Sequence, residues 1–90
     1  MGEVVALIRV MPKDILDEAG MEKLKSRIEE RIKEPARLER MEVKDIAFGI
    51  KAINVTVVVP DAAGGADLVA ESLSKIDEVE SAEVVDVGRL

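Results

Sequence analysis

The chain has 90 residues, a formal net charge of −6 and an apolar fraction of 48%, and it contains neither cysteine nor histidine. Its length fits one domain, and the apolar fraction is ample for a hydrophobic core. The missing residue types exclude disulfides, thiol chemistry, imidazole bases and the usual zinc sites, and the acidic balance disfavours nucleic acid and membrane surfaces as direct partners.

The first predicted element is a strand over residues 3–11, EVVALIRVM, which is rich in β-branched residues and is followed by Pro12. Both of its faces are apolar apart from Arg9, and such a strand usually lies in the middle of a sheet. The same stretch is neither a signal peptide nor a membrane span, so we expect a soluble, cytoplasmic protein. One face of the strand carries Val4, Ala6, Ile8 and Val10.

A helix is expected next, over residues 17–33, because apolar residues recur there in one stripe at helical spacing. Pro35 cannot continue the helix and marks its end. The following segment, residues 38–46, alternates imperfectly among charges, which is typical of an edge strand. The helical stripe consists of Met21, Leu24, Ile28 and Ile32.

Residues 49–59, GIKAINVTVVV, give the strongest strand signal of the chain, and a second amphipathic helix over residues 66–76 precedes a last strand over residues 81–87. The order β-α-β-β-α-β, with helices that are apolar on one side only, predicts an α+β, ferredoxin-like sandwich of a four-stranded antiparallel sheet with two helices on one face. We expect a single domain over residues 1–90. The other sheet face should stay open and carry Ile50, Ala52 and Val58 beside Asn54 and Thr56.

No enzyme chemistry is evident in the chain. The serines have no histidine to activate them, and carboxylate pairs such as Glu29–Glu30 fall on a charged helix face, where a solvated surface is the simpler interpretation. Gly64–Gly65 precedes a helix but lacks the spacing of nucleotide-binding loops. We therefore predict no catalytic residues, no metal ligands and no cofactor.

Two motifs far apart in the chain resemble one known family. IAFGIKAINVTVVVPD, residues 46–61, is similar to the hallmark strand of translation elongation factor 1-beta, and VESAEVVDVGRL, residues 79–90, to that family's closing strand and tail. The opening GEVVALIRVMP resembles archaeal members. The resemblance implies a ferredoxin-like guanine-nucleotide exchange domain, without the N-terminal domain and acidic linker of eukaryotic members. Its partner would be elongation factor 1-alpha, the GTPase that carries aminoacyl-tRNA.

The resemblance also implies roles for five residues. Phe48 and Gly49 match the family's aromatic–glycine pair, whose aromatic residue inserts into the GTPase domain of the partner while the glycine leaves room for close approach. Lys51 occupies a basic position that contacts the partner. Arg89 matches a penultimate lysine that approaches the magnesium and phosphates of the bound nucleotide, and Leu90 matches the terminal aliphatic residue. Arginine at this position departs from the lysine of the family. The two are not equivalent near a metal, because a guanidinium is planar and more weakly hydrated than an ammonium.

Other interpretations follow from the residues alone. A lone aromatic such as Phe48 is more often a core residue, and a residue as close to the chain end as Arg89 is more often frayed and solvated. The alternative function is a small ACT-like regulatory or oligomerisation module whose open sheet face pairs with another copy. The exchange factor, by contrast, is expected to be a monomer when free.

Overall fold

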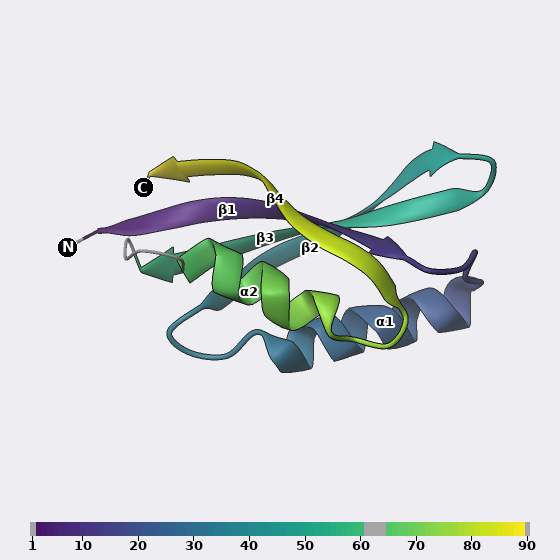
Figure 1. The fold of residues 1–90 in the computed structure, drawn as a ribbon, viewed down its shortest axis with the longest axis horizontal. Helices are drawn as coiled ribbons and strands as arrows, with labels where there is room; N and C mark the ends of the chain where they lie inside the picture. The colour runs from purple at the N-terminus through teal and green to yellow at the C-terminus, as the bar shows by residue number, and fades with distance from the viewer. Residues whose placement is uncertain (1, 61–64, 90) are drawn as a thin grey trace.

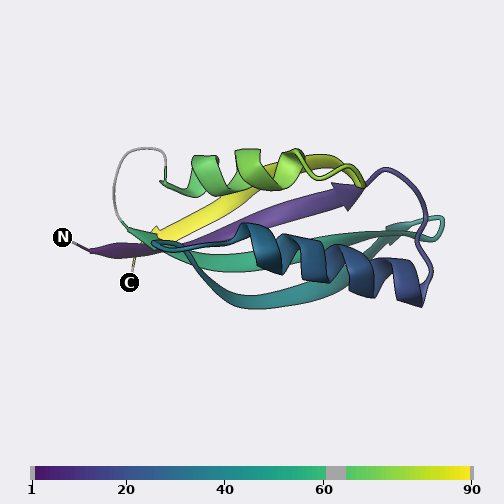
Figure 2. The same ribbon diagram turned by 90° about the horizontal axis from the view of Figure 1, so that it is seen from below.

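A computed structural model that describes residues 2–60 and 65–89 shows a four-stranded antiparallel sheet with two helices on one face (Figure 1 and Figure 2). The strand order is β2-β3-β1-β4, so β1 and β3 are central and β2 and β4 form the edges. This confirms the ferredoxin-like fold, the central position of the first strand and the edge position of the second. The elements are β1 (Glu3–Pro12), α1 (Glu18–Arg31), β2 (Arg37–Ala47), β3 (Ile50–Pro60), α2 (Gly65–Ser74) and β4 (Val79–Arg89).

The hydrophobic core lies between the sheet and the two helices. Alternate residues of β1 and β3 point toward the helices, as the period of two in a strand requires. Within the described residues, neither helix has the length and apolarity to cross a membrane. The fully buried side chains with the largest volumes are Ile8, Leu24, Ile28, Ile53, Leu73, Val10, Val55, Val57 and Val59.

Helix α1 begins at a side-chain cap and ends earlier than predicted. The Asp17 carboxylate accepts a hydrogen bond from the Gly20 N–H at 2.7 Å, which satisfies one of the unpaired donors of the first turn. The helix ends at Arg31 rather than at residue 33, because Ile32 adopts an extended backbone. The side chain of Ile32 still packs against the core, so the apolar stripe continues past the end of the helix.

Helix α2 also ends before its predicted boundary. The last helical residue is Ser74, and the N–H groups of Lys75 and Ile76 donate to the Ser72 and Leu73 carbonyls, each at 3.2 Å, in a tight closing turn. This turn keeps Ile76 buried at 4% exposure. The spacing of the apolar residues therefore predicted the buried face of the helix correctly but placed its end two residues too late.

The sheet face opposite the helices is less open than predicted. Ala52 and Val58 alternate with the core residues of β3, yet they are only 0% and 2% exposed. The Arg37 Nη1 of β2 donates to the Glu3 Oε2 of β1 at 2.8 Å, so this ion pair spans the intervening strand β3. Because Arg37 is the cross-strand partner of Val58, its side chain covers part of that face.

Candidate functional site

Phe48 and Gly49 form the turn that joins β2 to β3. Ala47 and Ile50 pair directly across it, and the two turn residues have φ angles of 52° and 81°. Two consecutive positive φ angles are the signature of a type I′ turn, whose twist matches that of the flanking strands. Gly49 was predicted to start the third strand; it lies in the turn instead, where its missing Cβ makes the positive φ inexpensive.

The Phe48 side chain is held in solvent. It is 95% exposed at the tip of a hairpin that extends beyond the rest of the sheet (Figure 1). The interpretation of Phe48 as a core residue is therefore wrong. A left-handed backbone costs a residue with a Cβ about 1–2 kcal/mol. Neither the exposure of the ring nor its backbone conformation stabilises the fold, and such an outlier at an exposed position points to a contact with another molecule.

Further exposed apolar side chains lie at this end of the molecule. Ile46 and Ile50 are 51% and 37% exposed and flank the turn, and Ile15, from the segment between β1 and α1, is 66% exposed. The Ile15 Cδ1 is 3.8 Å from the position that a Cβ on Gly49 would occupy, so Ile15 lies against the turn. We call Ile15, Ile46, Phe48 and Ile50 the hairpin-tip patch. Ile15 could not be identified from the sequence, because a single apolar residue in a polar loop forms no periodic pattern.

Lys51 lies on β3 close to this patch. It pairs with Asp45 of β2 across the hairpin and lines a cavity of about 200 Å³ between the hairpin and the start of α1. Three carboxylates at the start of α1 line this cavity, those of Asp17, Glu18 and Glu22. They create a negative potential around the lysine ammonium. The other lining residues are Leu16, Met21 and Val43.

Arg89 is the last described residue of β4 and pairs with Val4 of β1. It is an ordered part of the sheet, so the interpretation of a frayed end is wrong for this residue. The strand begins and ends two residues outside its predicted bounds of 81 and 87. A Cβ added at Gly88 would meet no atom within 4 Å, so a larger side chain would fit at this position and close packing does not require a glycine there. Leu90, the fifth predicted site residue, lies outside the described residues.

The structure brings some of the predicted residues together and separates others. Val4 pairs with both Val59 and Arg89, which places Arg89 level with the far end of β3. At about 3.3 Å per residue, β3 carries the chain roughly 30 Å from the turn to this level. The longest dimension of the molecule is 42 Å. Phe48 and Gly49, with Lys51 nearby, therefore occupy one end of the domain and Arg89 the other.

Comparison with known proteins gives one consistent family. Residues 5–90 match the model of the EF-1 guanine nucleotide exchange domain. The chain is 49% identical to elongation factor 1-beta of Methanothermobacter thermautotrophicus, over all of this chain and 99% of that protein. It is 42% identical to elongation factor 1-beta of Methanosphaera stadtmanae over all of this chain and 99% of that protein, and 41% identical to that of Natronomonas pharaonis over the whole of both chains.

Proposed function

Because the chain belongs to the EF-1 guanine nucleotide exchange domain family, we propose that it promotes GDP release from elongation factor 1-alpha through two separate contacts. One is the hairpin-tip patch with Phe48 and Gly49, and the other is the end of β4 with Arg89. Residues 1–90 would act as one exchange domain. Membership of this family favours exchange over the ACT-like alternative.

The exposure of Phe48 supports the first contact most directly. An aromatic ring that is 95% exposed, in a backbone conformation that other residues adopt at lower cost, is a candidate interface anchor. The adjacent Gly49 presents no side chain, so a partner surface can approach the turn closely. Ile15, Ile46 and Ile50 supply apolar surface around the ring, and Lys51 supplies a charge at the edge of the contact.

The position of Arg89 supports the second contact. The backbone of Arg89 pairs with Val4 of β1, so the residue is held at a defined position at one end of the sheet. A cation brought toward the nucleotide pocket of a GTPase competes with the magnesium ion and interacts with the phosphates that the metal holds. A guanidinium can also grip a phosphate or carboxylate through two parallel hydrogen bonds, which an ammonium cannot do. Leu90 would add an apolar group beside it.

Exchange then follows from linkage between two ligands of one GTPase. If the domain binds the empty GTPase more tightly than the GDP form, GDP must bind the complex more weakly by the same factor. A single coupling of about 1–3 kcal/mol changes affinity only ~5–150-fold. Contacts at both ends of the domain would therefore have to act together for efficient release. No bond is made or broken in the exchange factor during this process.

The remaining properties of the factor follow from its charge and its role. We infer that it acts in the cytoplasm, where translation takes place, and that it is a monomer when free. Its net charge of −6 disfavours a direct contact with tRNA or ribosomal RNA, so the GTPase would be its principal partner.

The direct test is release of fluorescent GDP from the elongation factor 1-alpha of the same organism, followed by stopped flow with and without the chain. The expected result is release that accelerates with the concentration of the chain and saturates. Identical traces with and without the chain would refute exchange activity. A rate that is accelerated equally by the Phe48→Ala variant would leave exchange intact but refute the role of the hairpin tip.

A further inference from the structure

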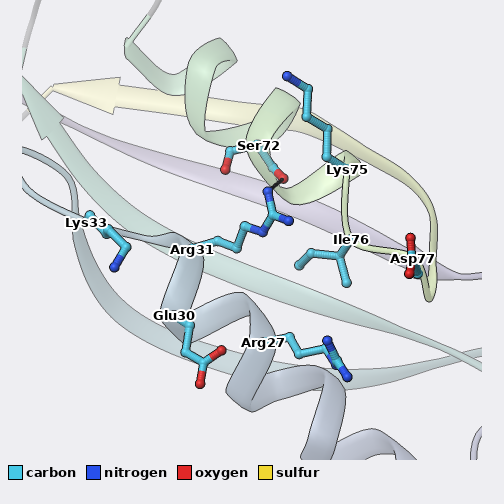
Figure 3. A pocket seen from close by; sticks show the side chains of 8 residues that line it. All are labelled: Arg27, Glu30, Arg31, Lys33, Ser72, Lys75, Ile76 and Asp77. Atoms are coloured by element: carbon cyan, nitrogen blue, oxygen red, sulfur yellow. Dashed lines mark hydrogen bonds between the residues drawn. The ribbon is translucent and has the colours of Figure 1, made fainter.

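A groove runs between α1 and α2, on the helical layer and away from the hairpin-tip patch (Figure 3). Its larger, polar part has a volume of about 680 Å³, and a smaller, apolar part of about 220 Å³ adjoins it. Arg31, Lys33 and Ser72 line both parts, so the two are continuous. We call the whole the interhelix groove. The apolar part is lined by Pro35, Ala36, Val59, Pro60, Leu68 and Val69.

Cations outnumber carboxylates in the lining of the polar part, and the lining of the apolar part includes Arg31 and Lys33 but no described carboxylate. Four cationic side chains line it, against the two carboxylates Glu30 and Asp77. The Arg27 Nε lies 3.2 Å from the Glu78 Oε2, so the charge at that end is neutralised. The other lining cations are Arg31, Lys33 and Lys75.

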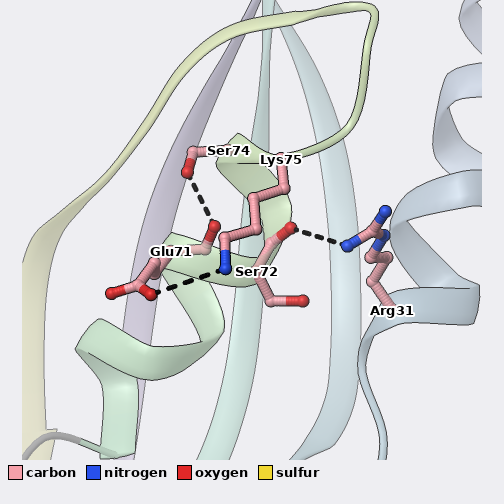
Figure 4. A network of polar contacts seen from close by, with 5 residues as sticks. All are labelled: Arg31, Glu71, Ser72, Ser74 and Lys75. Atoms are coloured by element: carbon pink, nitrogen blue, oxygen red, sulfur yellow. Dashed lines mark hydrogen bonds and ion pairs between the residues drawn. The ribbon is translucent and has the colours of Figure 1, made fainter.

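The remaining cations are held only weakly. Arg31 Nη1 reaches across from α1 and donates to the Ser72 carbonyl at 3.4 Å, close to the limit for a hydrogen bond (Figure 4). Lys75 pairs with Glu71 at 3.7 Å, with both side chains 66% exposed. Within the described residues, no carboxylate forms an ion pair with Arg31 or Lys33. An incoming carboxylate would displace little by binding there.

A structural role for these charges explains only part of the groove. Arg31 lies in the last turn of α1, where a cation favours the helix dipole. That role does not account for the apolar part of the groove beside it. Nor does it account for Leu68, which lines the apolar part and remains 65% exposed. Two cations next to an apolar pocket form a surface that complements an acidic and apolar ligand.

We propose that the interhelix groove binds a short acidic peptide segment, with an aliphatic side chain in the apolar part and carboxylates on Arg31 and Lys33. A protein segment fits better than a nucleic acid. Single-stranded nucleic acids bind through aromatic stacking, and the only aromatic residue of the chain, Phe48, is at the hairpin tip. The net charge of −6 also repels a polyanion more strongly than a peptide with a few carboxylates. None of the residues that line this groove is among the five residues proposed to contact the GTPase.

The test uses the full chain and a fluorescein-labelled synthetic peptide in which leucines alternate with pairs of Asp and Glu. Binding is measured by fluorescence anisotropy and mapped by backbone amide shifts in NMR. Leu68→Ser and Lys33→Glu should each weaken binding about ten-fold, and affinity should fall as salt is added. Lys23→Glu makes the same charge change on α1 outside the groove and should alter affinity by less than about two-fold. Thermal denaturation verifies that each variant is folded.

Three results would overturn the proposal. They are amide shifts at the hairpin tip instead of the groove, equal binding by the groove variants and the wild type, and equal binding by a peptide in which Asn and Gln replace the acids. Tighter groove binding by oligouridylate would overturn it in favour of a nucleic acid. Leu68→Ser should leave GDP release unchanged, so failure of the groove and failure of exchange activity are separate outcomes.

Discussion

Phe48 and Arg89 lie at opposite ends of the sheet, separated by roughly the 30 Å length of β3. One residue is at the tip of the β2–β3 hairpin and the other is held beside the beginning of β1. They cannot enter one small pocket together. Any partner that engages both must offer two separate surfaces, and each contact should fail independently of the other.

Replacing Phe48 with alanine should slow exchange without unfolding the domain. Truncation of an aromatic interface anchor costs about 2–4 kcal/mol of binding, so we expect catalysed GDP release at limiting factor to fall by ~30-fold or more. The side chain is 95% exposed, and the free energy of unfolding should change by less than about 0.5 kcal/mol. Leu68→Ala, at another exposed apolar position, is the matched control. Loss of cooperative unfolding in the Phe48 variant would contradict the anchor role.

Replacing Phe48 with asparagine should raise stability while it lowers activity. Asn-Gly is a favoured pair for a turn with two positive φ angles, whereas phenylalanine is strained there. We expect urea denaturation to show a gain of about 0.5–1 kcal/mol, together with slower GDP release. A variant that is less stable than the wild type would show that the ring supports the hairpin, contrary to our interpretation.

The distance between Phe48 and Arg89 predicts additive effects. Sites more than about 10 Å apart with no shared partner usually couple by less than ~0.5 kcal/mol. The double variant Phe48→Ala, Arg89→Ala should therefore slow release by about the product of the two single effects. Stopped-flow rates for the four proteins measure this coupling. A double variant no slower than the worse single variant would mean that both residues act on one element of the partner.

Arg89→Lys separates charge from hydrogen-bond geometry at the second contact. If the positive charge competes with magnesium, the lysine variant should retain most of the exchange activity. The rate of GDP release with arginine or lysine, relative to alanine at this position, should then fall as the magnesium concentration is raised. Substitution is preferable to deletion of the last residues, because Gly88 and Arg89 pair with β1 and their removal would shorten the sheet edge. Arg89→Ala provides the uncharged reference. Equal rates for all three proteins would exclude a role for this side chain.

Ile15→Ser tests the part of the hairpin-tip patch that comes from another segment. Loss of an exposed isoleucine from an interface should cost about 1 kcal/mol, or ~5-fold in the efficiency of exchange. Stability should hardly change, since the side chain is 66% exposed. Leu68→Ser makes the same chemical change outside the patch and should have no effect. An unchanged rate for Ile15→Ser would restrict the contact to the hairpin itself.

The spacing of the apolar residues was sufficient to predict the order of the elements and the buried face of each helix. It identified the central strand β1, the charged edge strand β2 and the stripe of α1. It could not fix where a helix ends, because Ile32 and Ile76 reach the core from non-helical backbone. It also could not reveal the burial of Val58 on the far face, which depends on a neighbouring strand.

The candidate site was only partly predictable. Phe48 and Arg89 stood out as a lone aromatic residue and a cation near the chain end, and the motifs around them pointed to one family. Their separation depends on strand register, which pairs Val4 with Arg89, and no local pattern encodes that distance. The approach of Ile15 to Gly49 is likewise a tertiary contact between a loop and a turn.

The pairing of β1 with β4 joins the first and the last strand of the described residues. During synthesis on the ribosome, one edge of β1 stays unpaired until β4, residues 79–89, has emerged. A prematurely terminated product would leave the ladder of a central strand open and prone to associate with other extended segments. The sheet, and with it the position of Arg89, can therefore be completed only after β4 is available to pair with β1.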